Sequence, residues 1–585
     1  MSNNSPVSNV ARFLPEAAAR QPDFPALRLP SRRGGALVYD TLTFAELETA
    51  ACAAARIFTQ KDIRRGSRVL LMVKPGRDLI LSVFALFKMG AAPVVIDPGM
   101  GRKHFLSCVR RTRPDAMVGI PLAQFLSRVF RKDFKSVKVR VTVGNKGFAK
   151  QIAALGKATF EPAQTTADEL AAILFTSGST GPPKGVRYEH GMFEAQVRMI
   201  RAHYGIEPGG VDLPMLPVFA LFNPALGLTT IVPEMNPSKP ATVDPAKIVQ
   251  AIHQNEVTNS FGSPVLWNRI ATHCEAEGVL LPSLKCILMA GAAVPPSLIR
   301  RMKQLAPNCE IHTPYGATEV LPVASNSGAQ ILNETLELTE QGRGVCVGEL
   351  LPEVQAQIIA IHDGPIATLA DAQPLPAGEI GEILVTGPSV TKAYDGLAAA
   401  TAAAKIADDG GQKSEIGFRK SDDSNQRIKP SQSSGDSDLR SPISDLRPPI
   451  SAIWHRMGDL GYFDEQGRLW FCGRMAERVE TPQGLMFTEC VEAIFNQHPS
   501  VFRSALIGRG ERPNQTPCVI IEPQPGEWPA DPAAEKAFVD ELLRLAASSE
   551  LTRGITEIRF KQQFPVDVRH NAKIHRLDLA REFAG

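Results

Sequence analysis

The sequence lacks the features that mark secreted, membrane-spanning and zinc-binding proteins. Its 585 residues hold nine cysteines, and no two of them form a CxxC pair, which argues against a zinc site and fits a reducing compartment. No apolar run reaches the ~18 residues that a bilayer-spanning helix needs. The polar start, Met1 to Val10, lacks the apolar core of a signal peptide. We therefore expect a cytoplasmic protein without a transmembrane segment.

An excess of charge of one sign is missing too. The 64 Lys and Arg residues nearly balance the 61 Asp and Glu residues, for a net charge of +3, so we expect no nucleic-acid partner. The stretch from Arg128 to Arg140 is locally basic. A solvated face is one interpretation of this stretch, and a surface for a peripheral membrane contact or a protein partner is the other.

Strand-like and helix-like patterns alternate along the first part of the chain. Thr43 and Glu46 form a capping box before a helix that should run to about Thr59. Strand runs at Arg68–Val73 and Ala91–Ile96 flank a helical spacing over Asp78–Met89. This rhythm predicts an α/β fold with parallel sheet, and 585 residues should divide into two or more domains.

Two later segments extend this pattern. Asp244 as N-cap and Pro245 at the first helical position predict a helix to about Asn255. Cys286 to Ala290 is typical of a buried strand, and it leads into a loop that contains Gly291, Ala292 and Ala293. Loops at the carboxyl ends of strands are where α/β sheets bind ligands.

A loop rich in hydroxyl groups and glycine follows the apolar run Ala171–Phe175 and carries most of the functional information. Glycines let backbone N–H groups converge on an anion, and hydroxyls add further donors. Lys184 would supply a point charge to the outer phosphates. The candidate anion-binding residues are Thr176, Ser177, Gly178, Ser179, Thr180, Gly181 and Lys184. This is not the Walker pattern, because Lys184 follows two prolines and no Ser or Thr comes after it.

Residues 176–185 resemble the pyrophosphate-binding signature of the adenylate-forming superfamily, which includes acyl-CoA synthetases, luciferases and fatty acyl-AMP ligases. Further family motifs follow in order: His312–Glu319 resembles the adenine and metal motif, Arg456–Leu460 the ribose motif, Gly473–Arg474 the hinge motif and Asn571–Ile574 the terminal lysine motif. The resemblance implies a large N-terminal domain of layered αβ sheets, residues 1–474. It also implies a small mobile α+β domain, residues 475–585.

The resemblance also implies the roles of individual residues. ATP and Mg²⁺ would be the cofactors, with Glu319 as the metal ligand and Thr318 at the α-phosphate. Lys573 would bridge the carboxylate and the α-phosphate. Asp459 and Arg474 would contact the ribose. The adenine would lie against the ring of Tyr315, beside its motif neighbours Thr313, Pro314 and Gly316 and across from Gly291, Ala292 and Ala293.

The hinge departs from the pattern of acyl-CoA synthetases. Glu477 could take the hinge role, whereas Glu480 stands where a lysine is common, and the loop Thr481–Gly484 is expected to be one residue longer. These differences put transfer to CoA in doubt.

Three other segments resemble the β-lactone synthetases of bacterial olefin biosynthesis: Ile96–Gly101, Leu216–Pro224 and Val566–Lys573. The implied substrate is a long-chain 2-alkyl-3-hydroxy acid, which is adenylated and then closed by its own hydroxyl group. A decarboxylating enzyme would use the product, and a complex with other enzymes of that pathway is implied too. A fatty acyl-CoA synthetase or acyl-AMP ligase is the alternative, and an inactive nucleotide-binding scaffold is a third. Phe219 and Phe222 fit either plain core or the wall of an acyl tunnel.

One segment interrupts the α/β pattern. From about Ala407 to Ser451 the chain is rich in Ser, Asp, Gly, Arg and Pro and contains an imperfect duplication. This composition predicts a disordered insertion, with a regulatory docking loop as the alternative.

Overall fold

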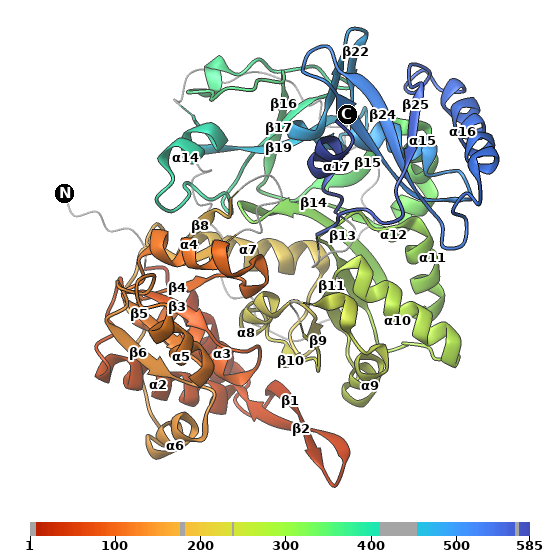
Figure 1. The fold of residues 1–585 in the computed structure, drawn as a ribbon. Coiled ribbons are helices and arrows are strands. Elements are labelled where there is room, and N and C mark those ends of the chain that lie inside the picture. The colour runs from red at the N-terminus through yellow and green to blue at the C-terminus, as the bar shows by residue number, and fades with distance from the viewer. Residues whose placement is uncertain (1–6, 176–181, 237–238, 409–452, 568–572, 585) are drawn as a thin grey trace, which may run out of the picture.

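The structure is a computed structural model that describes residues 7–175, 182–236, 239–408, 453–567 and 573–584 (Figure 1). The described strands form sheets of six, fourteen, three and two strands. The first two sheets and their helices make up the large N-terminal part of the chain, and the other two belong to the C-terminal part (blue in Figure 1). The insertion expected at 407–451 lies outside the described residues, except that Ala407 ends a strand and Asp408 follows it.

The six-stranded sheet is the parallel sheet that the sequence predicts. In spatial order its strands are β6 (Val139–Thr142), β5 (Ala116–Gly119), β3 (Arg68–Met72), β4 (Ala92–Val95), β7 (Leu170–Phe175) and β8 (Gly185–Glu189). The first five pair in parallel, and β8 is antiparallel to β7. The predictions for β3, β4 and β7 are confirmed to within two residues at each end.

Helices cover both faces of this sheet. Val69 and Leu71 pack in one core cluster, and Leu70 between them packs in another, because successive residues of a strand point to opposite faces. The helices of the first cluster are α2 (Phe44–Gln60), α3 (Arg77–Met89) and α6 (Lys146–Ala154), and those of the second are α4 (Arg102–Thr112) and α5 (Pro121–Val129). The expected capping box is present: Glu46 N–H donates to Thr43 Oγ1 at 3.2 Å, and Thr43 N–H donates to Glu46 Oε2 at 2.8 Å.

The fourteen-stranded sheet is half parallel and half antiparallel. In spatial order it contains β16 (Gln355–Ile359), β17 (Gly381–Thr386), β19 (Ile453–Phe463), β20 (Leu469–Arg474), β15 (Val345–Leu350), β14 (Val320–Ser327), β13 (Glu310–Ala317), β12 (Cys286–Met289), β11 (Asn259–Gly262), β9 (Val211–Pro214), β10 (Thr229–Ile231), β1 (Pro25–Arg33) and β2 (Ala36–Thr43), with β18 (Lys405–Ala407) paired to β19. Strands from β1 through β10, β9, β11 and β12 to β13 pair in parallel, and from β13 to β16 they pair antiparallel. The change of direction at β13 places the His312–Glu319 motif at the boundary between the two halves.

Helices pack on the parallel half of this sheet. They are α9 (Pro245–Asn255), α10 (Pro264–Glu277) and α11 (Pro296–Leu305), which share one core cluster with β9, β10, β12 and β13. The predicted N-cap of α9 is confirmed, since the Asp244 carboxylate accepts the Ala246 N–H. The helix α7 (His190–Tyr204) packs against β8 and β14, and so joins the two sheets.

The C-terminal part has its own core. Its strands are β21 (Val479–Thr481) and β22 (Gly484–Met486) in a hairpin, and β23 (Val501–Arg509), β24 (Thr516–Pro523) and β25 (Glu557–Phe560) in a sheet. The helices are α15 (Thr488–Phe495), α16 (Pro532–Ala547) and α17 (Arg576–Glu582). Phe495, Leu506 and Val519 pack together in a cluster made of C-terminal residues. Arg474 is the last residue of β20, and hence of the fourteen-stranded sheet, so we keep the proposed division after residue 474.

Two expectations drawn from what the sequence lacks agree with the structure. All nine cysteines are buried and free of disulfides. Within the described ranges no helix is both long enough and apolar enough to cross a bilayer.

Candidate active site

A cavity of about 2000 Å³ is lined by residues of both large sheets and of the C-terminal part. Its wall includes most of the described residues that the sequence motifs single out: Lys184, Gly291, Ala292, Ala293, Thr313, Pro314, Tyr315, Gly316, Thr318, Glu319, Asp459, Arg474 and Lys573. The structure thus brings together side chains that lie up to 389 positions apart, from Lys184 to Lys573. The remaining candidates, Thr176, Ser177, Gly178, Ser179, Thr180 and Gly181, lie outside the described residues.

Tyr315, Asp459 and Arg474 form a connected group at one end of the cavity. Tyr315 lies on β13, while Asp459 and Arg474 are direct partners across β19 and β20. The Tyr315 hydroxyl donates to Asp459 Oδ2 at 2.6 Å, and Arg474 Nη1 lies 2.7 Å from Asp459 Oδ1. The charge of Asp459 raises the pKa of Arg474, and burial followed by that same charge raises the pKa of Tyr315. An ionised carboxylate has about four acceptor positions, so Asp459 keeps capacity for the ribose hydroxyls.

Two glycines of these motifs occupy backbone positions that disfavour a side chain. Gly316 sits where the register of β13 and β14 shifts, and a Cβ there would lie 2.8 Å from Val320 O. Gly291 follows β12 with φ of +96°, a conformation that favours glycine. Thr313 donates its hydroxyl to Asn326 O at 3.3 Å, so this motif residue is tied to β14.

Thr318 and Glu319 occupy the turn between β13 and β14. Tyr188 OH donates to Thr318 O at 2.5 Å, and Thr391 N–H donates to Glu319 O at 2.9 Å. Tyr394 OH donates to Glu319 Oε1 at 2.7 Å. The turn is therefore held by residues of β8 and of the loop after β17, and the carboxylate of Glu319 faces the cavity.

The residues present fit a magnesium ion that is shared with a nucleotide. Among the residues that the structure describes, no group of three or more His, Cys, Asp or Glu side chains could hold a metal on its own. Mg²⁺ is commonly bound through one or two carboxylates together with substrate phosphates and water. Glu319 supplies one carboxylate at the cavity wall, which suits that kind of site.

Lys184 and Glu319 both contact the side chain of Tyr394. The Nζ of Lys184 is 4.8 Å from the centroid of the Tyr394 ring, whose hydroxyl reaches Glu319. The ammonium group of Lys184, the phenol of Tyr394 and the carboxylate of Glu319 thus form one group beside the β13–β14 turn.

Lys573 reaches the same cavity from the C-terminal part. Burial, followed by the positive charge of Arg474, lowers the pKa of Lys573, while Asp459 and Glu477 oppose that shift. Asp567 N–H donates to Lys573 O at 3.0 Å. The described conformation therefore places Lys573 beside the Tyr315, Asp459 and Arg474 group.

Arg576, three residues after Lys573, anchors this segment, and sequence reasoning missed it. Its guanidinium pairs with Glu477 at 3.1 Å, Glu489 at 3.2 Å and Glu492 at 2.5 Å. Burial opposes the charge of Arg576, but the three carboxylates prevail and raise its pKa. Glu477, the expected hinge residue, thus pairs with the segment that carries Lys573.

A second residue that sequence reasoning missed is Lys405, which follows the alanine-rich helix α14 (Ala398–Ala404) and begins β18. Its side chain is 8% exposed, and its Nζ donates to Thr391 Oγ1 at 3.3 Å. Thr391 Oγ1 in turn donates to Glu319 O at 3.0 Å. Burial lowers the pKa of Lys405 to about 7. A lone lysine in an apolar stretch was the available signal, but its long-range partner could not be read from the sequence.

The charge of Arg456, in the ribose motif, is paired with a carboxylate of the protein. Its guanidinium pairs with Glu382 at 2.6 Å, and both side chains are at most 5% exposed. Arg456 also donates to Gly364 O at 2.6 Å. This buried pair joins β17 to β19, the strand that also carries Asp459.

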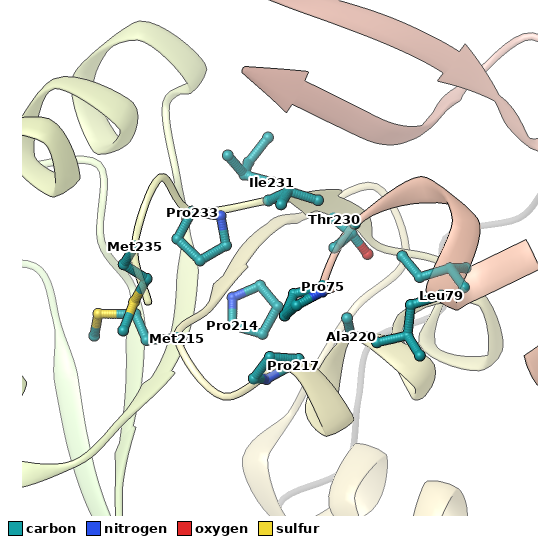
Figure 2. Close-up of a pocket in the computed structure, with 13 residues that line it drawn as sticks. Pro75, Leu79, Pro214, Met215, Pro217, Ala220, Thr230, Ile231, Pro233 and Met235 are labelled. Atoms are coloured by element: carbon teal, nitrogen blue, oxygen red, sulfur yellow. The ribbon is translucent and has the colours of Figure 1, made fainter. Parts of the chain in front are cut away.

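The opposite end of the cavity is apolar. Phe219 and Phe222 are half-buried and line the cavity, which favours the tunnel-wall interpretation over plain core. Phe219 stacks on Phe261, with ring centroids 3.6 Å apart. A smaller apolar pocket adjoins this end, and Figure 2 shows its lining by prolines, methionines and aliphatic side chains. Residues shared by the two cavities are Pro75, Leu79, Pro217, Pro233 and Met235.

Comparison with known proteins identifies the family. The profile of the AMP-binding enzymes matches residues 14–395. The chain belongs to the AMP-binding enzyme family. It is 42% identical to an olefin beta-lactone synthetase of Xanthomonas campestris over 98% of this chain and 97% of that protein. An olefin beta-lactone synthetase of Stenotrophomonas maltophilia is 41% identical over the same shares.

A solved structure shows the same fold at low identity. An amide bond synthetase from Marinactinospora thermotolerans superposes with a TM-score of 0.73 and 20% identity, over 98% of this chain and 100% of that one. The AMP-binding enzyme described here therefore has the fold of the adenylate-forming enzymes, a large α/β N-terminal part with a small C-terminal part.

The hinge segment of this AMP-binding enzyme is a tight hairpin. Thr481 and Gly484 pair directly across a two-residue turn. Glu480 lies 2.7 Å from Arg478, which also pairs with Asp363 of the large part at 2.8 Å. The acid at position 480 thus belongs to an ion-pair network that crosses the boundary at residue 474.

Proposed function

We propose that this AMP-binding enzyme activates a long-chain 2-alkyl-3-hydroxy acid with ATP and closes it to a β-lactone. The observation that carries the proposal is the 42% identity, over nearly the whole of both chains, to a protein named olefin beta-lactone synthetase. The cavity supports it, because a charged end and a large apolar end open into one space. A long acid could place its carboxylate at the charged end and its alkyl chains at the other.

In the first step a carboxylate oxygen of the acid attacks the α-phosphorus of ATP and pyrophosphate leaves. Two anions must approach each other, and charge grows on the phosphate oxygens, so positive groups have to be in place beforehand. Lys573 would contact both the carboxylate and the α-phosphate, and Lys184 would hold the leaving pyrophosphate. Asp459 and Arg474 would hold the ribose, and Tyr315 the adenine. Glu319 would hold Mg²⁺, which supplies charge neutralisation at the phosphates.

In the second step the 3-hydroxyl oxygen attacks the acyl carbon, the hydroxyl proton is released, and AMP leaves as the ring closes. The nucleophile is already part of the substrate, so this step needs no thiol channel. Holding hydroxyl and acyl carbon in one molecule raises the effective concentration of the nucleophile, which offsets part of the ring-strain barrier. The acidic Glu480 and its ion pair with Arg478 fit a hinge that does not guide a thiol.

The surroundings of this reaction form part of the proposal. A strained lactone must be consumed by another enzyme, and one that expels carbon dioxide would yield an alkene. We propose that the protein works in the cytoplasm beside that enzyme.

Product analysis tests the proposed function. The enzyme is incubated with ATP, Mg²⁺ and a long-chain 2-alkyl-3-hydroxy acid, with and without CoA, and the products are identified by mass spectrometry. We expect lactone, AMP and pyrophosphate in both mixtures. A matched substrate that lacks the 3-hydroxyl group should yield acyl-adenylate but no lactone. Accumulation of acyl-CoA, with turnover only when CoA is present, would show instead that the enzyme is an acid–thiol ligase.

A further inference from the structure

The helix α5 has its apolar and polar faces inverted relative to a normal surface helix. Leu122 and Phe125 are each 61% exposed, Val129 is 55% exposed and Leu126 is 36% exposed. These positions follow helical spacing and lie on one face. Gln124 and Ser127 are buried on the other face.

The buried polar residues of α5 are bonded to the protein, so the inverted orientation is fixed. Gln124 Nε2 donates to Val141 O at 2.7 Å, and Ser127 Oγ donates to Gln124 O at 2.8 Å. Arg140 Nε donates to Ser127 Oγ at 3.3 Å. Rotating the helix to bury Phe125 would break these bonds and leave buried polar groups unpaired. The outward apolar face is therefore a stable property of the fold.

This apolar face lies at the edge of the large cavity. Leu122 and Leu126 line the cavity as well as being exposed, and so does Val95 at the end of β4, which is 38% exposed. Phe105 and Ile120 continue the apolar lining inward. In Figure 1, α5 lies beside β5 and β6 in the orange N-terminal part of the chain. Apolar residues of the exposed α5 face thus also form part of the cavity wall.

Positive charge surrounds the same face. The exposed cations that follow or end α5 are Arg128, Arg131, Lys132, Lys135 and Lys138. Asp133 is the only acidic residue between positions 116 and 160 of the sequence, and it pairs with Arg110. A row of exposed apolar side chains beside clustered Lys and Arg is the composition that binds the interface of an anionic bilayer.

We propose that the exposed face of α5 and the basic segment 128–138 dock the cavity mouth onto an anionic lipid membrane. Phe125 and Val129 would insert among the acyl chains, while Arg131 and Lys132 would pair with lipid phosphates. The acid could then pass from the bilayer along Leu122 and Leu126 into the cavity without crossing water. The choice of a lipid over a protein partner rests on the proposed function, because an acid with two long alkyl chains resides in membranes. The basic charge is complementary to either anionic lipid or an acidic protein, and the test separates the two.

Vesicle binding tests the surface without ATP or substrate, so its outcome is independent of the proposed function. The full-length protein is mixed with vesicles of phosphatidylcholine alone, or of phosphatidylcholine with phosphatidylglycerol, and the bound fraction is measured by flotation. We expect binding to the anionic vesicles that weakens as salt is added. In the double variant Phe125→Ser and Val129→Ser the partition constant should fall about tenfold or more, since each change removes an apolar side chain from the lipid.

Matched variants separate the two contributions. Arg131→Glu with Lys132→Glu should abolish the preference for anionic vesicles, whereas Lys303→Glu with Lys536→Glu changes the net charge equally on exposed sites elsewhere and should bind as the unchanged protein does. Leu280→Ser, at an apolar residue 53% exposed, is the control for Phe125. Unchanged melting temperatures and ATP–pyrophosphate exchange with a short soluble acid would show that Phe125→Ser and Val129→Ser leave fold and site intact.

Two results would overturn the proposal. If the unchanged protein binds neither kind of vesicle, α5 is not a lipid-binding surface. If the unchanged protein binds no vesicles but forms a larger species in solution, and the double variant Phe125→Ser and Val129→Ser does not form that species, a protein covers that face instead. If the unchanged protein does bind but the double variant binds equally well, the membrane surface lies elsewhere.

Discussion

The two ends of the cavity are built in different ways. At the nucleotide end, charged and hydroxyl side chains are tied to one another, as Tyr315 and Arg474 are to Asp459 and as Tyr394 is to Glu319. At the apolar end, the side chains of Phe219 and Phe222 contact other apolar side chains: Phe219 stacks on Phe261, and Phe222 packs against a hydrophobic cluster. Fixed hydrogen bonds orient groups for a reaction whose charges are defined. Packing without polar anchors gives volume and shape, which suits a chain that carries no charge. Substitutions at the first end should therefore change rate or stability, and those at the second end should change which acid is used.

The largest expected effect is on stability, at the buried pair of Arg456 and Glu382. Arg456→Leu leaves Glu382 buried without a partner, and breaking a buried pair in this way costs about 3–5 kcal/mol. Chemical denaturation should show that loss in the free energy of unfolding. The double variant Arg456→Leu and Glu382→Leu should recover most of it, because no isolated charge remains. A single variant that is as stable as the unchanged protein would mean that the pair is not buried as described.

The next effect is on rate. Lys573→Ala should lower pyrophosphate release by about 10²–10³-fold, since it removes one charge from the reacting oxygens. Lys536→Ala, on the exposed face of α16, is the control and should leave the rate unchanged. Near-normal pyrophosphate release by a folded Lys573→Ala protein would refute the role of this lysine.

A smaller effect concerns Lys405 and pH. Burial lowers the pKa of Lys405 to about 7 in the folded protein. Between that pH and the ordinary lysine pKa, Lys405 is therefore protonated in the unfolded chain but not in the folded one. The charged lysine therefore costs stability below pH 7, and this cost is lost as pH rises. The stability advantage of Lys405→Met should fall by about 1.4 kcal/mol per pH unit between roughly pH 7.5 and 9.5. Equal pH slopes for both proteins would contradict the assignment, and Lys303→Met is the exposed control.

The smallest effect is expected at the apolar end. Ala220 lines the pocket of Figure 2, and Ala220→Leu should fill it. Competition between a long and a shorter acid should then shift about tenfold toward the shorter one, since a few methylenes in an apolar pocket are worth that ratio. ATP–pyrophosphate exchange with the shorter acid should stay near normal. An unchanged preference would place the alkyl chains elsewhere in the cavity.

Sequence patterns predicted the parts of this structure that depend on neighbours in the chain. The capping box of Thr43 and Glu46 and the N-cap at Asp244 act within one helical turn, so they could be read directly. The family motifs located the residues of the nucleotide end. The partners of Lys405 and Arg456 could not be predicted in the same way. Lys405 contacts Thr391 and Arg456 contacts Glu382, and no local sequence pattern reveals these contacts.

The helix α5 shows a different limit of sequence reasoning. Helical spacing of Leu122, Phe125, Leu126 and Val129 would ordinarily predict a face turned toward the core. The structure turns that face outward, because Gln124 bonds to Val141 O of the neighbouring strand β6. The antiparallel strands from β13 onward were likewise not predicted, since their pairing depends on segments far apart in the chain.

The central claim is that the carboxylate of the acid is activated and its hydroxyl group is the nucleophile. The most direct test uses a substrate that is labelled with a heavy oxygen isotope at both carboxylate oxygens and is unlabelled at the hydroxyl oxygen. The carboxylate oxygen that attacks phosphorus leaves with AMP, so mass spectrometry should find one heavy oxygen in AMP and one in the lactone. A lactone that keeps both heavy oxygens, with unlabelled AMP, would show that the hydroxyl group is activated instead and would contradict the account.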